Sequence, residues 1–221
     1  MFAALKEQGV EELAVHDRAR IDGFLGTLDA RRACGAEDPL SAVRETALVC
    51  TRCRLSQARH RVVFGSGPAR AEIMFVGEAP GFEEDQQGEP FVGPAGQLLT
   101  RMIEAMGLKR ERVYIANCVK CRPPGNRDPL PDELESCLPY LKTQIERVAP
   151  RVIVCLGRVA SQTLLKREEP ISRLRGRFTL VNGRQVMCTF HPSYLLRNPQ
   201  EKRLAWEDLK KVRELLKTHS P

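Results

Sequence analysis

The sequence of 221 residues lacks several features that mark particular classes of protein. No apolar run approaches the roughly 20 residues that a membrane-spanning helix needs. The first 15 residues carry Lys and Glu side chains where a secretion signal would have an apolar core. Internal repeats and low-complexity tracts are missing as well. We therefore expect a cytoplasmic protein, nucleoid-associated if the source is bacterial, with no membrane partner.

Aromatic residues are scarce, at 5% of the chain, but the hydrophobic content of 42% is enough for the core of one α/β domain. The net charge is +7, and residues 151–221 carry 15 basic and 6 acidic side chains. A basic segment of this kind favours a polyanionic partner, because each Lys or Arg near a phosphate releases condensed counterions. The alternative is a solvated basic surface, and charge alone leaves both interpretations open.

Short apolar runs alternate with helical patterns after residue 50, which predicts a mainly parallel sheet covered by helices on both faces. Residues 50–221 are the expected main domain, and residues 1–49 an N-terminal extension that is helical or partly mobile, with one helix over 1–33. The Asn182-Gly183 dipeptide predicts a tight hairpin turn. The expected strands are 72–76, 113–119, 152–156, 178–181 and 185–190, and the expected helices are 94–106, 131–148, one ending at 165, and 204–216.

Polar residues that could bind a ligand or take part in a reaction follow three of these strands. The turn Gly77–Gly81 contains Glu78 and precedes Glu84, Asn117 ends the second strand, and His191 follows the last. Each feature alone is more often structural, as a turn, a helix cap or a core histidine. Ligands of such sheets bind beyond the carboxyl ends of the strands, however, so their shared position indicates a binding site.

Of the eight cysteines, Cys118, Cys155 and Cys188 lie in apolar runs and one lies in the poorly patterned N-terminal region, which leaves a set of four: Cys50, Cys53, Cys121 and Cys137. Disulfides are rare in a reducing compartment, which leaves metal binding or burial as the explanation for so many cysteines. The Cys50-x-x-Cys53 pair suits a metal or a redox dithiol, while the wide spacing of the other two suits a cluster assembled from distant segments. The spacing leaves zinc and iron–sulfur both open.

Residues from Cys50 to about Leu209 resemble the family 4 uracil-DNA glycosylases through several long motifs in the same order. Residues 1–49 lie outside the resemblance. The motifs are CTRCRL (50–55), VFGSG (63–67), MFVGEAPG (74–81), EDQQGEPFVGPAGQLL (84–99), NCVKCRPPGNR (117–127) and HPSYLLR (191–197).

This resemblance implies a three-layer α/β/α sandwich around a mainly parallel four-stranded sheet, and an enzyme that flips uracil out of DNA and hydrolyses its glycosidic bond in base excision repair. It also implies a [4Fe–4S] cluster on the four cysteines named above. The implied uracil contacts are Gly77, Glu78, Ala79, Phe91, Asn117 and His191.

Elementary chemistry suggests how such residues would act. Phe91 would stack on the base, and the Asn117 amide would match both N3–H and O4 of uracil. His191 would donate a hydrogen bond to the departing uracil anion, while Glu84 or Glu78 would position the water. The expected contacts with single- or double-stranded DNA are Ser193, Tyr194, Leu195 and Arg197, in a monomeric protein.

Two other functions fit parts of the pattern. A non-catalytic nucleic-acid-binding module would explain the basic charge, but it would not need Phe91, Asn117 and His191 together. A redox sensor built on the cysteines would leave the same three residues as a coincidence. One relative, a variant that traps uracil covalently, has a basic, His-bearing insertion between the strand that ends at the Asn and the last cysteine. Here the chain continues from Cys121 into Arg122-Pro123 without such an insertion, which indicates ordinary turnover.

Overall fold

The computed structural model describes residues 10–12 and 38–218 of the chain. The helix expected over residues 1–33 lies largely outside these ranges. The three described residues within it, Val10–Glu12, form a short strand, β1, so the expected helix is wrong at this point. The reason is backbone pairing: β1 lies parallel to β5 (Phe178–Val181) at the edge of the sheet. The boundary proposed near residue 49 stays a prediction.

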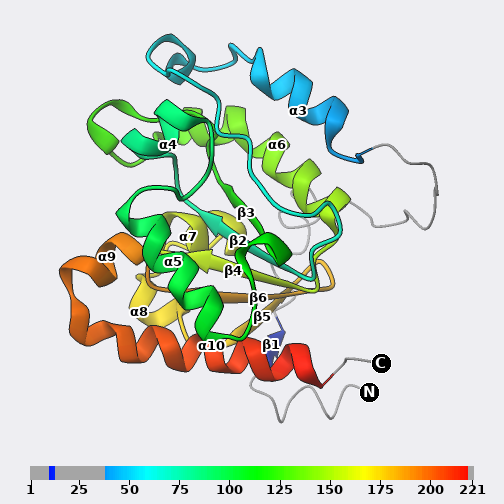
Figure 1. Ribbon diagram of the computed structural model, residues 1–221, viewed down its shortest axis with the longest axis vertical. Helices are drawn as coiled ribbons and strands as arrows, with labels where there is room; N and C mark the ends of the chain where they lie inside the picture. Colours follow the sequence, from blue (N-terminus) through cyan, green and yellow to red (C-terminus); the bar gives the residue numbers. More distant parts are fainter. Residues whose placement is uncertain (1–9, 13–37, 219–221) are drawn as a thin grey trace.

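A single sheet runs through the middle of the molecule, with strand order β1-β5-β6-β4-β2-β3 (Figure 1). Neighbouring strands are parallel except β5 and β6, which form the expected hairpin. Both turn residues, Asn182 and Gly183, have positive φ, as a tight hairpin turn requires. The remaining strands are β2 (Ile73–Gly77), β3 (Tyr114–Asn117), β4 (Val152–Leu156) and β6 (Arg184–Thr189).

The mainly parallel sheet is confirmed. It has six strands, whereas the sequence pattern predicts five and the resemblance implies four. The hairpin carries the sheet beyond β6, because β5 folds back antiparallel to it and β1 then adds to the new edge. β3 is also shorter than expected, since the chain after Asn117 leaves the sheet at the point where β2 ends.

Helices cover both faces of the sheet, as the sequence predicts. The main helices are α3 (Ser41–Leu48), α4 (Phe82–Gln87), α5 (Pro94–Ala105), α6 (Pro131–Val148), α7 (Arg158–Leu165), α8 (Ile171–Leu174), α9 (Pro192–Arg197) and α10 (Lys202–Lys217). Short 3₁₀ turns occupy Arg54–Gln57, Arg110–Arg112, Pro124–Asn126 and Pro199–Glu201.

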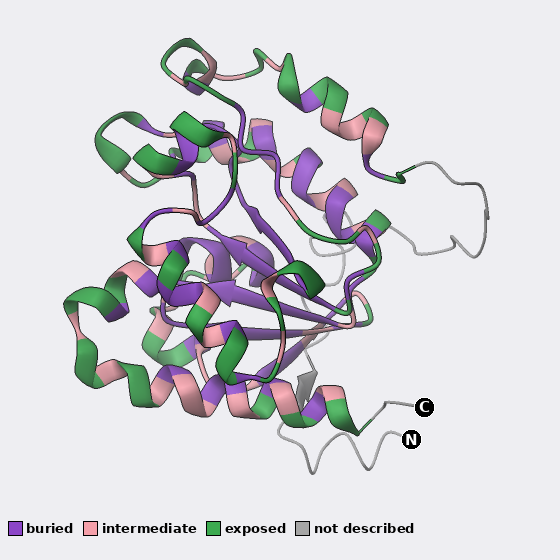
Figure 2. Cartoon of the chain, viewed as in Figure 1, coloured by how far each residue is buried: buried purple, intermediate pink, exposed green. Residues whose placement is uncertain are grey.

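Two apolar cores lie on opposite faces of the sheet, which accounts for the three layers. Along β2, Met74 and Val76 pack into the core beneath α6 and α7, while Ile73 and Phe75 pack into the core beneath α5 and α10. This alternation places side chains on both faces, and every residue of β2 is buried (Figure 2). Burial on both faces explains why the strands read as continuous apolar runs.

Local sequence explains where α5 and α6 begin. Pro94 and Pro131 occupy the first turn, where the missing N–H costs nothing. In α6 the Glu133 carboxylate also accepts a hydrogen bond from the Leu130 N–H, which satisfies a backbone donor at the helix start. The same carboxylate is paired with Arg127, which ties the preceding loop to this helix.

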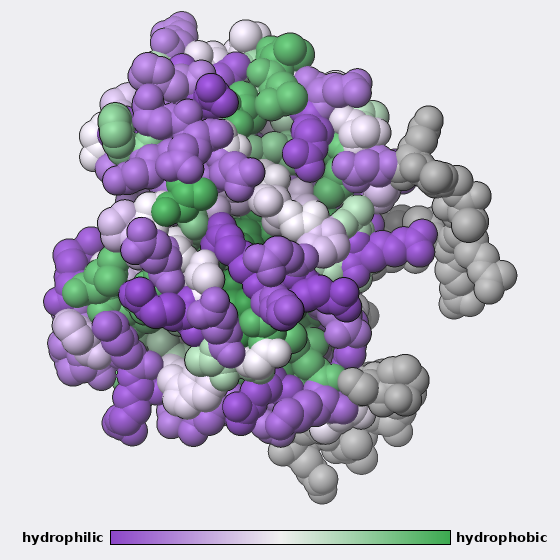
Figure 3. Space-filling model, in the orientation of Figure 1, coloured by the Kyte–Doolittle hydropathy of each residue, from purple (hydrophilic) through white to green (hydrophobic). Residues whose placement is uncertain are grey.

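The exposed surface is mainly polar, in agreement with the 29% of charged residues in the sequence. In the view of Figure 3 most of the exposed side chains are hydrophilic, with apolar side chains gathered in small separate areas. No helix among the described residues is long and apolar enough to cross a membrane.

Candidate active site

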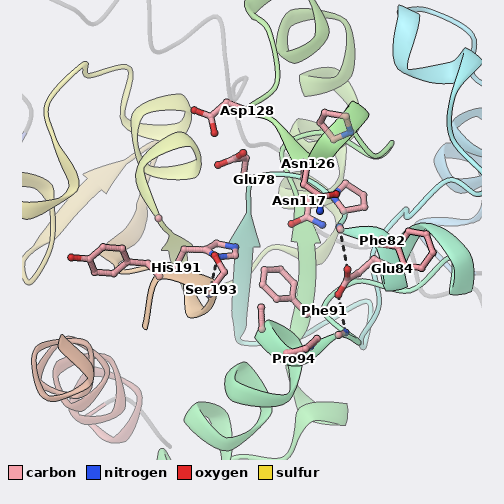
Figure 4. A pocket seen from close by; sticks show the side chains of 18 of the residues that line it. Glu78, Phe82, Glu84, Phe91, Pro94, Asn117, Asn126, Asp128, His191 and Ser193 are labelled. Atoms are coloured by element: carbon pink, nitrogen blue, oxygen red, sulfur yellow. Dashed lines mark hydrogen bonds between the residues drawn. The ribbon is translucent and has the colours of Figure 1, made fainter. Parts of the chain in front are cut away.

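A cavity of about 570 Å³ opens at the carboxyl ends of β2, β3, β4 and β6, where the sequence predicts a binding site. Most of the expected site residues line it, and they come from segments far apart in the sequence (Figure 4). The expected residues in its lining are Glu78, Ala79, Glu84, Phe91, Asn117, His191, Ser193, Tyr194 and Arg197.

Gly77 lies directly behind this lining and controls how closely the aromatic wall approaches the sheet. It pairs with Asn117 across β2 and β3. A Cβ added at Gly77 would lie 2.4 Å from Asn117 Oδ1 and 2.6 Å from Phe91 Cζ. Only glycine therefore allows the Phe91 ring to lie against the strand end beside the Asn117 amide.

Phe91 is buried and has a φ of 54°, an unusual backbone conformation for a side chain of this size. Glu84 holds the loop in this state. Its Oε1 accepts hydrogen bonds from the Val92 and Gly93 N–H groups at 2.9 and 3.0 Å, and its Oε2 accepts one from Gly81 at 3.1 Å. These bonds make Glu84 a brace between the turn after β2 and the loop that carries Phe91 (Figure 4).

The Asn117 side chain is buried, with 1% of its surface exposed, and its Oδ1 has no hydrogen-bond partner among the described residues. A buried acceptor without a partner is costly, by about 1–3 kcal/mol. Because this amide faces the cavity, a ligand that offers an N–H donor would remove the penalty.

His191 lies beside Phe91, and the centroids of the two rings are 5.7 Å apart. Its Nδ1 accepts a hydrogen bond from the Ser193 N–H at 3.1 Å and lies 2.7 Å from Ser193 Oγ. This assigns the ring proton to Nε2 in the neutral form. Burial, reinforced by the positive charge of Arg197, lowers the pKa of His191 to about 4.

Glu78 faces a second acid that sequence reasoning did not single out. Its carboxyl is hydrogen-bonded to Asp128, which is also paired with Arg158. Burial, followed by the charge of Asp128, raises the pKa of Glu78 to about 7. Glu78 therefore exchanges a proton near neutral pH, which suits a general base.

Asn126 and Asp128 line the cavity too, on the loop that follows β3. A turn at this place was predictable from the sequence. In the structure Gly125 and Asn126 both adopt positive φ, which folds the segment after Cys121 back over the cavity. A Gly-Asn pair after a proline pair is a turn signal, but composition does not say what the turn will face.

The expected DNA contacts on α9 are only partly exposed. Tyr194 and Leu196 are exposed by 36% and 39%, whereas Leu195 is 1% exposed and packs into a core with Leu98 and Phe190. Consecutive residues of a helix point in different directions, and Leu195 points inward, so its expected contact with DNA has no exposed side chain to support it here and stays a prediction. Beneath α9, Arg175 stacks on Phe190 and is paired with the buried Asp208.

The four cysteines singled out from the sequence line a second, smaller pocket, separate from the cavity at the strand ends. Cys50 and Cys53 follow α3, Cys121 follows β3, and Cys137 lies within α6. The remaining described cysteines, Cys118, Cys155 and Cys188, are buried elsewhere, as expected for Cys155 and Cys188 from their apolar runs.

Comparison with known proteins identifies the family. A family model described as the uracil DNA glycosylase superfamily matches residues 64–210. The type-4 uracil-DNA glycosylase of Sulfurisphaera tokodaii is 45% identical over 80% of this chain and 85% of its own length. Those of Saccharolobus solfataricus and Archaeoglobus fulgidus are each 46% identical, over 81% of this chain and 87% and 94% of their own lengths. The chain belongs to the type-4 uracil-DNA glycosylase family. The resemblance seen in the motifs is thereby confirmed.

The geometry around His191 generates a testable prediction. The unfolded histidine has a pKa of about 6.5, whereas burial lowers that of the folded residue to about 4. As the pH falls from about 6.5 the unfolded chain takes up a proton that the folded protein does not, so folding stability should decline. Nuclear magnetic resonance of the His191 ring should show a neutral imidazole protonated on Nε2 throughout this range. The Ser193→Ala variant should keep that tautomer, because the backbone N–H remains. Titration of the ring near 6.5 would contradict the assignment.

Proposed function

We propose that this protein removes uracil from DNA by hydrolysing its N-glycosidic bond, which leaves an abasic site for base excision repair. The observation that carries the proposal is the cavity in which Asn117, Phe91 and His191 meet, with an unpartnered buried acceptor on Asn117. Membership of the type-4 family supports the same activity.

Uracil fits the chemistry of this cavity. The Asn117 Oδ1, which has no partner among the described residues, would accept from N3–H, and its Nδ2 would donate to O4. Cytosine presents a donor at position 4 and an acceptor at N3, so the same amide would meet the wrong partner twice. The Phe91 ring would stack on the face of the base.

Departure of uracil places a negative charge on the base that is absent in the ground state. In its neutral tautomer His191 has Nε2–H as its available donor, and we propose that it points at uracil O2 as the charge develops. Backbone N–H groups of the turn Gly77–Ala79 would share this role. Because the ring is neutral beforehand, it needs no proton from solvent to act.

Glu78 is our choice for the acid that positions and deprotonates the attacking water. Its pKa near 7 leaves a large fraction of carboxylate at neutral pH that still accepts a proton well. Both Glu84 oxygens, in contrast, are engaged by backbone N–H groups of two loops. We therefore assign Glu84 a structural role in holding the Phe91 loop.

We further propose that Cys50, Cys53, Cys121 and Cys137 hold a [4Fe–4S] cluster. The surroundings fit an anionic thiolate set: the Arg59 guanidinium donates to Cys121 Sγ at 3.2 Å, and the Lys120 backbone N–H donates to Cys137 Sγ at 3.2 Å. Arg52 and the Lys120 ammonium lie around the same pocket. Basic groups and N–H donors of this kind stabilise thiolates.

Among the described residues, no three His, Cys, Asp or Glu side chains converge as ligands of one metal ion. A cubane cluster does not require such convergence, because each thiolate binds a different iron atom. When bound, the cluster would tie α3, the segment after β3 and α6 together near the cavity. Hydrolysis of a glycosidic bond needs no electron, so its role in this proposal is structural.

Single- or double-stranded DNA containing uracil is the proposed substrate, met by a monomer in the cytoplasm or on the nucleoid. Tyr194, Leu196 and Arg197 on α9 are exposed beside the cavity and would meet the strand there. Ser193 bonds His191, so its proposed contact with a phosphate would come in addition to holding the ring.

The first test is cleavage of an oligonucleotide that contains one uracil. The protein should release uracil, and His191→Ala should lower the single-turnover rate by about 10²–10³-fold, the scale for one lost donor to a developing anion. The dissociation constant for DNA and the melting temperature should change far less. If affinity and stability fall while the saturated rate survives, His191 only holds its loop.

A second test separates the two acids. Activity should rise with pH through about 7, as Glu78 loses its proton, and Glu78→Gln should lower the maximal rate by about 10²–10⁴-fold. The matched variant Glu84→Gln keeps the size and one acceptor oxygen, so its main effect should be a lower melting temperature. A large loss of rate in Glu84→Gln at an unchanged melting temperature would reverse the assignment.

A third test concerns the cluster. Protein purified without oxygen should contain iron and sulfide in roughly equal amounts, and Cys137→Ala should lose both. Cys118→Ala is the control, because Cys118 is also buried but lies outside the cysteine pocket. Stoichiometric zinc without iron in natively prepared protein would refute the cluster.

A further inference from the structure

Phe82 is an aromatic residue at the cavity for which the proposed mechanism has no use. It begins α4, directly after the turn that carries Glu78, and it lines the cavity. Its side chain is 52% exposed, unlike Phe91, which is buried at 6%. In Figure 4 Phe82 and His191 lie on opposite sides of Asn117 and Phe91. The apolar ring is thus presented at the mouth of the cavity rather than in its interior.

A cation accompanies this ring. The Arg122 guanidinium carbon lies 5.0 Å from the centroid of Phe82, within the range of a cation–π contact. Arg122 Nε donates to Asn126 Oδ1 at 2.7 Å, so Asn126 holds the guanidinium while leaving its positive charge uncancelled. An exposed ring beside a fixed positive charge is the combination that binds single-stranded nucleic acid, since the ring stacks on a base and the cation attracts the phosphate.

We propose that Phe82 is a stacking platform for the nucleobase next to the flipped uracil on the same strand. The proposal rests on the proposed function, because it requires a uracil in the cavity. When uracil leaves the stack, its neighbour loses a partner face, and the Phe82 ring replaces that face. Arg122 then lies close to the backbone that joins the two nucleotides.

The chemistry of the platform determines what it recognises. Every base has a π-face, so the site tolerates any sequence, with more overlap for a purine than for a pyrimidine. In a duplex the neighbouring base remains paired and stacked on its other side. Phe82 therefore contributes most to single-stranded substrates. This contribution is equal in the ground and transition states, so it appears in substrate affinity and not in the maximal rate.

Tyr194 has a different role despite its similar exposure. Its ring stacks on Phe190 at a centroid distance of 5.1 Å, and it belongs to α9, beside His191. Phe190 is covered in turn by Arg175. Phe82 comes from the opposite side of the cavity, so the two rings would meet different parts of the bound strand.

The decisive experiment compares Phe82→Ala, Phe82→Leu and Phe82→Trp on single-stranded oligonucleotides with one uracil between purines. The apparent dissociation constant in single-turnover cleavage should rise about 5–150-fold for the Ala and Leu variants, the equivalent of about 1–3 kcal/mol for one base–aromatic stack. Phe82→Trp should retain wild-type affinity. The saturated rate should stay the same in all three, and Leu130→Ala, which removes an exposed apolar side chain outside the cavity lining, should change neither quantity.

A second substrate isolates the contact itself. If both neighbours of uracil are abasic, the wild type and Phe82→Ala should bind with equal affinity. The proposal is overturned if Phe82→Leu binds as tightly as the wild type, or if the deficit of Phe82→Ala persists on the abasic-flanked strand.

A fluorescence measurement keeps this inference separate from the activity. The sequence contains one Trp, Trp206, so the indole introduced by Phe82→Trp adds a second emitter at the cavity. A non-cleavable uracil oligonucleotide should quench that added emission, and the abasic-flanked version should not. Quenching without any cleavage by the wild type would sink the proposed function and leave the platform standing, while cleavage without quenching would do the reverse.

Discussion

The side chain of Lys120 connects the cavity at the strand ends with the cysteine pocket. It is almost fully buried, and its ammonium donates to the Asn117 carbonyl at 2.8 Å and to Gln144 Oε1 at 2.5 Å. Its backbone N–H donates a hydrogen bond to Cys137 Sγ, and the next residue is Cys121. Gln144 then reaches Phe64 and Tyr114 through its amide nitrogen. A buried cation is stable only with such partners, so the strand that ends at Asn117 and the cysteine pocket hold each other in position.

A second constraint operates at the same edge of the sheet, at the carboxyl ends of β2 and β4, where side chains from other segments approach the backbone closely. Gly77 leaves room for the Phe91 ring. Gly157 has a φ of 88°, and a Cβ added there would lie 2.9 Å from the Cβ of His191, so glycine leaves room for that side chain too. Cavity shape thus depends on two glycines at the ends of adjacent strands. Glu84 then fixes the Phe91 loop by bonds to backbone N–H groups, a role that needs a carboxylate but no reactivity.

The sequence predicted most of the sheet, because strands buried on both faces are continuous apolar runs bounded by turns. The limits of β4 and β5 and both ends of α6 agree with the expected ranges. Long-range pairing was harder: nothing local to Val10–Glu12 indicates an edge strand beside β5. Burial within a short helix was harder still, since Leu195 and Leu196 are the same residue type and only packing against Phe190 separates them. Asp128 escaped notice for the same reason, because its importance lies in a contact with Glu78 across two loops.

Basic side chains lie at the mouth of the cavity, and acidic side chains lie in its interior. The mouth carries Arg122 and Arg197, which suit the phosphates of a strand. The interior holds Glu78 and Asp128 close enough to share a hydrogen bond. In the proposed reaction the sugar becomes positive as the base becomes negative, so a carboxylate on the sugar side and a neutral donor on the base side would stabilise both products of the same bond cleavage. Burial and the positive charge of Arg197 both lower the pKa of His191 and so disfavour its protonated form. The ring is thereby kept in the neutral form that the proposed donation from Nε2–H to the departing uracil requires.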